Sequence, residues 1–178
     1  MATKNEVGVY VGRFNPPHNG HITVINELIR DFNKDNIVLI GSCIESNTLH
    51  NIFSYQQRRE MLREVFGGYI NIAGIPDFHN NNLAWFSYIK DLVKLKYNGL
   101  DRDIVFYGGS QNDIFYAVDA GFKTKVISRY DNSKLSSSEI KDNLIQKKSI
   151  FEMVPQEIEG TIITGFNEFW HNRYKKPK

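Results

Sequence analysis

Residues 7–21 read VGVYVGRFNPPHNGH, and this stretch decides the fold of the 178-residue chain. The apolar run Val7–Val11 predicts a buried strand, which stops at Gly12 and gives way to a turn stiffened by two prolines. The pattern that follows is helical, with its apolar residues on one face: Ile22, Ile25, Leu28 and Ile29. A strand, a tight turn and a helix form the unit in which α/β proteins bind ligands, because the helix start offers N–H groups to an anion.

Two imidazoles stand at the predicted helix start. His18 and His21 are three residues apart, so both can lie on one side of the first turn. Gly20 between them removes a Cβ, so a phosphate or an adenine can approach the backbone, and Arg13 adds a forked cation. A histidine pair alone is more often a surface or capping feature, but the buried strand and the prolines favour an anion site. Because the GxGxxG and GxxxxGK[ST] motifs are absent, we expect a different phosphate cradle.

The composition indicates a globular protein in a reducing compartment. The chain is 41% hydrophobic and 13% aromatic, which excludes a disordered protein. A formal net charge of +2 gives no reason to expect nucleic acid, and a single cysteine, Cys43, excludes an internal disulfide framework. No signal peptide is evident, and no segment reaches the ~20 apolar residues of a membrane span. We therefore expect a cytoplasmic protein that does not bind membranes.

Strand and helix patterns alternate along the chain, which predicts an α/β fold with a doubly wound parallel sheet of about five strands. The further strands are expected at Ile37–Ser42, Tyr69–Ile75, Asp103–Tyr107 and Phe122–Ser128. Helices are expected at Tyr55–Phe66, Leu83–Tyr97 and Gln111–Ala120, after Ser136, and from Pro155 onward. We expect a single domain, 1–178, with a C-terminal helical extension at about 155–174.

Loops at the same edge of the sheet add candidate residues. Arg58 lies one turn inside the helix that follows the polar loop 43–53, whereas Arg59 fits a solvated helix face. Trp85 follows three consecutive amides, Asn80–Asn82. It either stacks on a flat heteroaromatic ring beside an Asn or packs in the core, and composition leaves both interpretations open.

Glycine, arginine and serine residues follow the last two strands. Gly108 either lets a ligand approach the backbone or simply makes a turn, and Arg129 stands just past the fifth strand. Ser136–Ser138 open a helix, where three hydroxyls and the cation of Lys141 would make a second anion site. The plainer interpretation of these serines is a helix cap or a loop.

The motif at 12–21, GRFNPPHNGH, resembles the GRFxPxHxGH signature of the nucleotidylyltransferases. Over residues 7–144 the order of motifs resembles the archaeal type of nicotinamide-mononucleotide (NMN) adenylyltransferase. The segment 41–58 is similar to the family's GS…NPFT…ER, Asn82–Trp85 to its nicotinamide-holding residues, and 136–141 to its second phosphate motif. The chain departs from the family pattern at Asn15, Pro17, Ile52, Gln57 and Lys141, and it carries no Nudix signature.

The resemblance implies a Rossmann-like fold and three sets of site residues, with no metal ligand. The implied catalytic residues are His18, His21, Arg13 and Arg129. The implied ATP-binding residues are Gly12, Arg13, Phe14, His18, Gly20, His21, Gly108, Arg129, Ser136, Ser137, Ser138 and Lys141. The implied residues for the second substrate are Ser42, Arg58, Asn82 and Trp85.

The implied reaction is transfer of the adenylyl group of ATP, with Mg²⁺, to NMN, which forms NAD and pyrophosphate. The resemblance also implies a homo-oligomer, and the net charge of +2 gives no reason to expect a nucleic-acid partner. One alternative is the same chemistry on another phosphate acceptor: phosphopantetheine, flavin mononucleotide or glycerol phosphate. A second is a nucleotide-sensing module without turnover, and nucleic-acid binding through the basic end is a distant third.

Overall fold

The computed structural model describes residues 5–79, 81–128 and 135–174. Five strands form one parallel sheet in the order β3-β2-β1-β4-β5, which confirms the predicted α/β fold. The strands are β1 (Glu6–Gly12), β2 (Asn36–Ile40), β3 (Ile72–Gly74), β4 (Asp103–Gly108) and β5 (Lys123–Val126).

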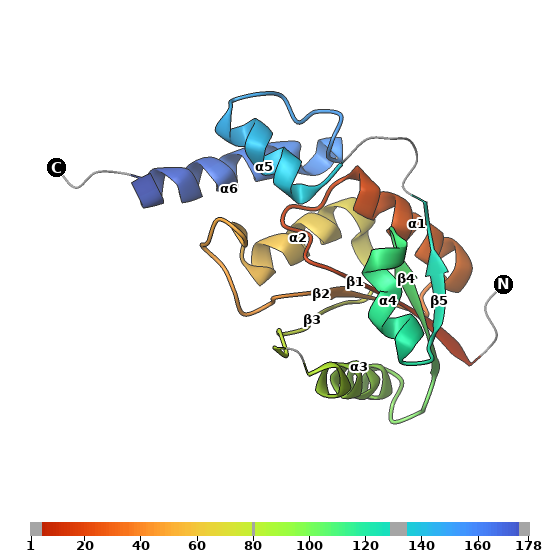
Figure 1. Ribbon diagram of the computed structural model, residues 1–178. Helices are drawn as coiled ribbons and strands as arrows, with labels where there is room; N and C mark the ends of the chain where they lie inside the picture. Colours follow the sequence, from red (N-terminus) through yellow and green to blue (C-terminus); the bar gives the residue numbers. More distant parts are fainter. Residues whose placement is uncertain (1–4, 80, 129–134, 175–178) are drawn as a thin grey trace.

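Helices cover both faces of the sheet. They are α1 (Asn19–Phe32), α2 (Tyr55–Phe66), α3 (Asn82–Lys96), α4 (Gln111–Asp119), α5 (Ser137–Ile145) and α6 (Gln156–Tyr174), with a short 3₁₀ turn, η1 (Gly67–Tyr69), after α2. Helices α1 and α2 lie on one face and α3 on the other, while α5 and α6 lie beyond α2, away from the sheet (Figure 1). Within the described ranges, no helix is long and apolar enough to cross a bilayer.

The alternation of side chains along β1 explains the two layers of helices. Tyr10 packs with α1 and α2, whereas Val7 and Val9 pack with α3 and α4 on the other face. All three side chains are buried, since β1 is the central strand and is covered on both sides. Gly8 leaves room for Leu28 of α1, whose Cδ1 lies 2.5 Å from the position that a Cβ at Gly8 would take.

The third strand is shorter than the sequence predicted. It begins at Ile72 rather than Tyr69 because α2 ends at Phe66 and its C-cap, Gly67, has a positive φ of 55° that turns the chain into η1. The side chain of Asn36 then replaces strand pairing, since it donates to Tyr69 O (2.9 Å) and accepts from Asn71 N (3.2 Å). The fifth strand, predicted over Phe122–Ser128, likewise covers only Lys123–Val126.

The order of strands places a crevice at the carboxyl end of β1. Its neighbours are β2 and β4, and the chain leaves β1 toward α1 on one face but leaves β4 toward α4 on the other. Such a switch in winding direction is where open α/β sheets bind ligands. Helix α5 reaches the same edge, because Ser137 Oγ donates to Pro16 O (3.0 Å) in the turn after β1.

Candidate functional site

A cavity of about 260 Å³ opens at this carboxyl edge of the sheet. Four segments line it: the end of β1 with its loop and the start of α1, the loop after β2, the start of α4, and the start of α5. The lining residues are Tyr10, Val11, Gly12, Arg13, Phe14, Asn15, His18, His21, His50, Asp113, Ser136, Ser137, Ser138 and Lys141. Nine of the ATP-binding residues expected from the sequence are therefore brought together around one space.

The two histidines at the start of α1 are buried, and their tilted rings pack against each other. Their ring centroids are 3.6 Å apart with 31° between the planes, and Phe14 packs 4.7 Å from His21. His18 N donates to His21 Nδ1 (3.2 Å), so His21 caps its own helix. A neutral imidazole that accepts at Nδ1 carries its proton at Nε2. The backbone contact thus fixes both the orientation and the tautomer of the His21 ring.

The C-terminal segment lies against the start of α1. Asn19 N donates to Met153 O (2.9 Å), and the Asn19 amide donates to Glu152 O (2.9 Å). This corrects one expectation, because the first main-chain N–H of α1 faces a carbonyl and not an anion. Gly20 is buried in the same turn and does not line the cavity. The side chains of His18 and His21 are therefore what this helix start presents to a ligand.

At the start of α5, the serines serve as both cap and cavity wall. Ser136 Oγ accepts from Glu139 N (3.2 Å), as the capping interpretation predicted. Lys141 Nζ donates to two carbonyls of the loop after β2, Leu49 O (3.3 Å) and His50 O (3.1 Å). Burial, followed by the nearby charge of Arg13, lowers the pKa of Lys141 from its ordinary value. The ammonium of Lys141 and the guanidinium of Arg13 are thus neighbouring cations among the described residues that line the cavity.

Besides Gly20, three further expected residues, Ser42, Arg58 and Gly108, lie outside the cavity because they serve the packing or bonding of the fold. Ser42 Oγ donates to Asp77 Oδ1 (3.1 Å), which ties the loop after β2 to the loop after β3. Arg58 is fully buried and bonded to main-chain carbonyls, so it does not present a guanidinium to a ligand. A Cβ at Gly108 would lie 2.5 Å from Ile114 Cγ2, so close packing of α4 explains this glycine. Arg129 lies outside the described residues.

Trp85 packs in the core, as one of the two interpretations predicted, and also borders a hollow. Its ring stacks on Phe106 in the core, with centroids 6.1 Å apart, and meets Tyr116 edge-on at 4.9 Å. Trp85 also lines a second hollow of about 260 Å³ with Asn82 and Tyr116. Asn81 beside it is used as a cap, since its side chain accepts from Ala84 N (3.0 Å). Trp85 is therefore a half-buried aromatic wall next to the exposed amide of Asn82.

Sequence reasoning missed several lining residues: Tyr10, Val11, Asn15, His50 and Asp113. His50 is an exposed residue of an aperiodic loop, and nothing local marks it as part of a phosphate site. Asp113 had a detectable signal, because Ser110 three residues earlier forms a cap in which Ser110 Oγ accepts from Asp113 N (3.3 Å). Such a cap places a carboxylate at the start of α4, close to the end of β4.

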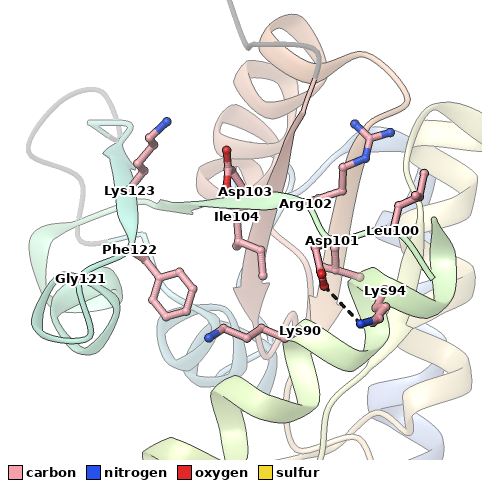
Figure 2. A pocket seen from close by; sticks show the side chains of 11 residues that line it. Lys90, Lys94, Leu100, Asp101, Arg102, Asp103, Ile104, Gly121, Phe122 and Lys123 are labelled. Carbon is pink, nitrogen blue, oxygen red and sulfur yellow. Dashed lines mark ion pairs between the residues drawn. The ribbon is translucent and has the colours of Figure 1, made fainter. Parts of the chain in front are cut away.

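A larger hollow, of about 480 Å³, lies at the opposite end of β4 and β5. Figure 2 shows Lys90 directed toward the ring of Phe122, while Arg102 and Lys123 point away to the other side of β4. Lys94 is paired with Asp101 (3.4 Å), and Lys123 with Glu6 (2.5 Å). The cations of this hollow therefore do not converge on one point, and the hollow does not form an anion site like the cavity at the carboxyl edge.

The described part of the chain contains no group of three or more His, Cys, Asp or Glu residues that could hold a metal ion. Among the described residues around the site cavity, Asp113 is the one carboxylate. Such a donor set does not form a cage for a hard divalent cation, which prefers several oxygen ligands.

Comparisons with known proteins identify the family of the chain. The model of the cytidylyltransferase-like family matches residues 9–143. The chain is 32% identical over 158 residues to the nicotinamide-nucleotide adenylyltransferase of Thermococcus sibiricus, a match that covers 85% of this chain and 80% of that protein. It is 27% identical over 172 residues to the protein of the same name from Haloarcula marismortui, which covers 92% of this chain and 85% of the relative.

Solved structures with a similar fold include a bifunctional NMN adenylyltransferase/ADP ribose pyrophosphatase from Francisella tularensis, complexed with AMP and a manganese ion. The TM-score is 0.74 at 19% identity, over 96% of this chain and 53% of that one. A NadR protein in complex with NAD and AMP-PNP gives 0.55 at 21% identity, over 78% of this chain and 42% of that one. The chain thus spans about half or less of these two proteins, and the likeness shows the fold alone.

Proposed function

Because the chain belongs to the cytidylyltransferase-like family, we propose that it is an enzyme that transfers the adenylyl group of ATP to NMN, forming NAD and pyrophosphate. Its curated archaeal relatives are named for this activity at 27–32% identity over most of the chain. One observation supports the proposal most directly: the closely packed pair His18 and His21 shares a cavity with Arg13, Lys141 and the start of α5.

In the proposed reaction, a 5′-phosphate oxygen of NMN attacks the α-phosphorus of ATP in line. A new P–O bond forms as the bond between the α-phosphorus and the bridging oxygen breaks, and pyrophosphate leaves with the electron pair. No side chain has to act as a nucleophile, so catalysis consists of positioning and charge stabilisation. His18 and His21 would oppose the charge that develops on the α- and β-phosphates. Arg13, Lys141 and the hydroxyls of Ser136–Ser138 would hold the departing pyrophosphate.

We assign the second substrate to the hollow beside Trp85. Asp113 lines the first cavity and Tyr116 the second, and they are three residues apart on α4. Side chains at this spacing are neighbours on a helix, so the two hollows flank the same turn. A mononucleotide with its ring against Trp85 could therefore direct its phosphate toward the first cavity, with Asn82 beside its amide.

A divalent cation, expected to be Mg²⁺, would be held by the ATP phosphates and water. The donor set fits this arrangement, because Asp113 supplies a single carboxylate among cationic side chains. When bound, the ion neutralises phosphate charge. Arg129 remains a proposed ligand of the leaving group. The homo-oligomeric state, the cytoplasmic location and the single-domain organisation stay predictions.

The reaction is tested by pyrophosphate release from ATP and Mg²⁺ with a panel of phosphate acceptors. We expect release with NMN, together with an equal amount of NAD. If pyrophosphate is released with phosphopantetheine, flavin mononucleotide or glycerol phosphate instead, the transfer reaction is supported but NMN is not the second substrate. ATP binding without release for any acceptor would support the sensing module.

Replacing Trp85 by Ala should raise the KM for NMN about two- to tenfold, because ring stacking of this kind contributes about 0.5–1.5 kcal/mol. The KM for ATP should stay nearly constant. Some thermal stability should also be lost, since Trp85 packs on Phe106. The measurement is steady-state kinetics with each substrate varied in turn. Leu83→Ala is the matched control, because Leu83 is on the same helix, 84% exposed and outside the hollow. An unchanged KM for NMN in Trp85→Ala would leave the tryptophan with a core role only.

The lowered pKa of Lys141 predicts a pH dependence of ATP binding. A lysine whose pKa is depressed loses its charge at a lower pH than an ordinary lysine does. The neutral amine no longer attracts phosphate, so the Kd for ATP should rise as the solution becomes alkaline, by about tenfold for the loss of one charged contact. Titrations of ATP between pH 7 and pH 10 measure this rise. Lys141→Arg should flatten the curve, because a guanidinium stays protonated throughout; parallel curves for the two proteins would contradict the assignment.

A further inference from the structure

Arg58 is a charged residue held entirely inside the protein. It projects from α2, has no exposed surface and forms no ion pair with any residue that the structure describes. Its guanidinium instead donates to main-chain oxygens of two loops: Nη1 to Arg13 O and Gly41 O (both 2.8 Å), and Nη2 to Ser42 O (3.0 Å). Nε completes the set with Ser54 O (3.3 Å) at the start of its own helix. Carbonyl dipoles thus replace a carboxylate as partners of this buried cation.

These carbonyls lie where pairing between β1 and β2 ends. The last main-chain bond between the two strands joins Gly41 N to Gly12 O (2.9 Å). Beyond that bond the chains diverge, and buried carbonyls there need other donors. A planar guanidinium can serve several oxygens at fixed angles, whereas an ammonium is a single point of charge. Arg58 therefore extends the pairing of the two strands by one further step, into the loops that border the site.

Both loops are bent at the points that Arg58 holds. Phe14, which follows Arg13, has φ of 49°, and Ser42 has φ of 47°. Residues other than glycine persist in this region only where surrounding contacts fix them. The bend at Phe14 matters for the site, because its buried ring packs against His21. A chain of contacts therefore leads from the Arg58 guanidinium through the Arg13 carbonyl and Phe14 to the His21 imidazole.

We propose that Arg58 is a positioning residue for adenylyl transfer: it fixes the loops after β1 and β2, and through them the side chain of Arg13 and the imidazole of His21. This inference rests on the proposed function, and it replaces the direct substrate contact expected from the sequence. Arg58 touches no reacting atom in this role. Its effect on the reaction depends on the geometry of the residues that it supports.

The test compares Arg58→Lys with Arg59→Lys, the same change at a neighbouring helix position that is not fully buried. Lysine at position 58 keeps the charge, but three N–H groups on a single nitrogen cannot serve the four carbonyls that the forked guanidinium bonds. We expect Arg58→Lys to remain folded, to lose roughly tenfold to hundredfold in kcat, as small misplacements of catalytic groups do, and to bind ATP more weakly. Arg59→Lys should match the wild type. A lower melting temperature with unchanged kcat and unchanged ATP Kd, both measured well below melting, would reduce Arg58 to a structural residue and overturn the proposal.

A double-mutant cycle on ATP binding shows whether Arg58 acts through Arg13. If it does, Arg58→Lys should weaken ATP binding in the wild type but change the Kd by less than about twofold in an Arg13→Ala background. Equal effects in the two backgrounds would contradict action through Arg13. The cycle needs no second substrate, so it tests the role of Arg58 even if the wild type releases no pyrophosphate with any acceptor. The absence of pyrophosphate release would count against the proposed function and not against the role of Arg58.

Discussion

His21→Ala is expected to lower kcat by about 10²–10³-fold, which corresponds to about 2.7–4 kcal/mol of lost transition-state stabilisation. The imidazole lies in the cavity with His18, Arg13 and Lys141, where a pentavalent α-phosphorus would accumulate charge. Phe14 and His18 pack against its ring, and its Nδ1 is occupied by the His18 N–H, so it is oriented before the substrate arrives. A donor oriented in this way stabilises charge without reorganisation during the reaction.

The alanine variant also removes a helix cap, and this second effect has to be separated from the first. Loss of a cap costs about 0.5–2 kcal/mol of stability. Glutamine can replace histidine as the capping residue. At the start of α2 the side chain of Gln57 accepts from Ser54 N (2.8 Å), which is the same geometry in which His21 caps α1. His21→Gln should therefore restore most of the melting temperature and still lack the imidazole. We expect His21→Ala to be slow in single-turnover pyrophosphate release even where His21→Gln shows that the cap is restored; near-normal turnover in His21→Ala would remove His21 from the mechanism.

The central features of the fold could be predicted from the sequence because they depend on local patterns. The apolar run of β1, the apolar face of α1 and the regular alternation of strands and helices specify a parallel sheet with helices on both faces. The histidines were found for the same reason, since they stand at a strand-turn-helix junction. The exact ends of β3 were not predictable, because side-chain bonds from Asn36 take the place of strand pairing there.

The residues that sequence reasoning misassigned depend on contacts between distant segments. Arg58 was expected to touch a substrate, and its helical position was right. The direction of its guanidinium depends on where β1 and β2 stop pairing, which no local pattern fixes. The contact between Asn19 and Met153 closes the start of α1 across more than 130 residues, and His50 reaches the cavity on an aperiodic loop. Such details follow from the tertiary structure, so they were invisible in the sequence.

Leu28→Ala is expected to have the largest effect on stability and almost none on chemistry. Leu28 is fully buried in α1, and its Cδ1 occupies the space above Gly8 of the central strand. Gly8 has no side chain that could fill the space that alanine at position 28 would leave. Replacing a buried leucine by alanine costs about 2–5 kcal/mol, more where the surroundings cannot relax. For a domain whose total stability is about 5–15 kcal/mol, this lowers the melting temperature by on the order of 10 °C.

The position of Leu28 separates this loss from the site. It lies seven residues after His21, about 10 Å along the helix axis, so the imidazoles keep their contacts while the protein is folded. Thermal unfolding and kcat, measured on the same preparation well below melting, should therefore diverge: a low melting temperature with wild-type kcat. Asn26→Ala, at an exposed position of the same helix, is the control and should change neither. A fall in kcat for Leu28→Ala in the folded state would mean that the packing of α1 on β1 also sets the geometry of His18 and His21. The core, and not only the contacts of Arg58, would then position the site.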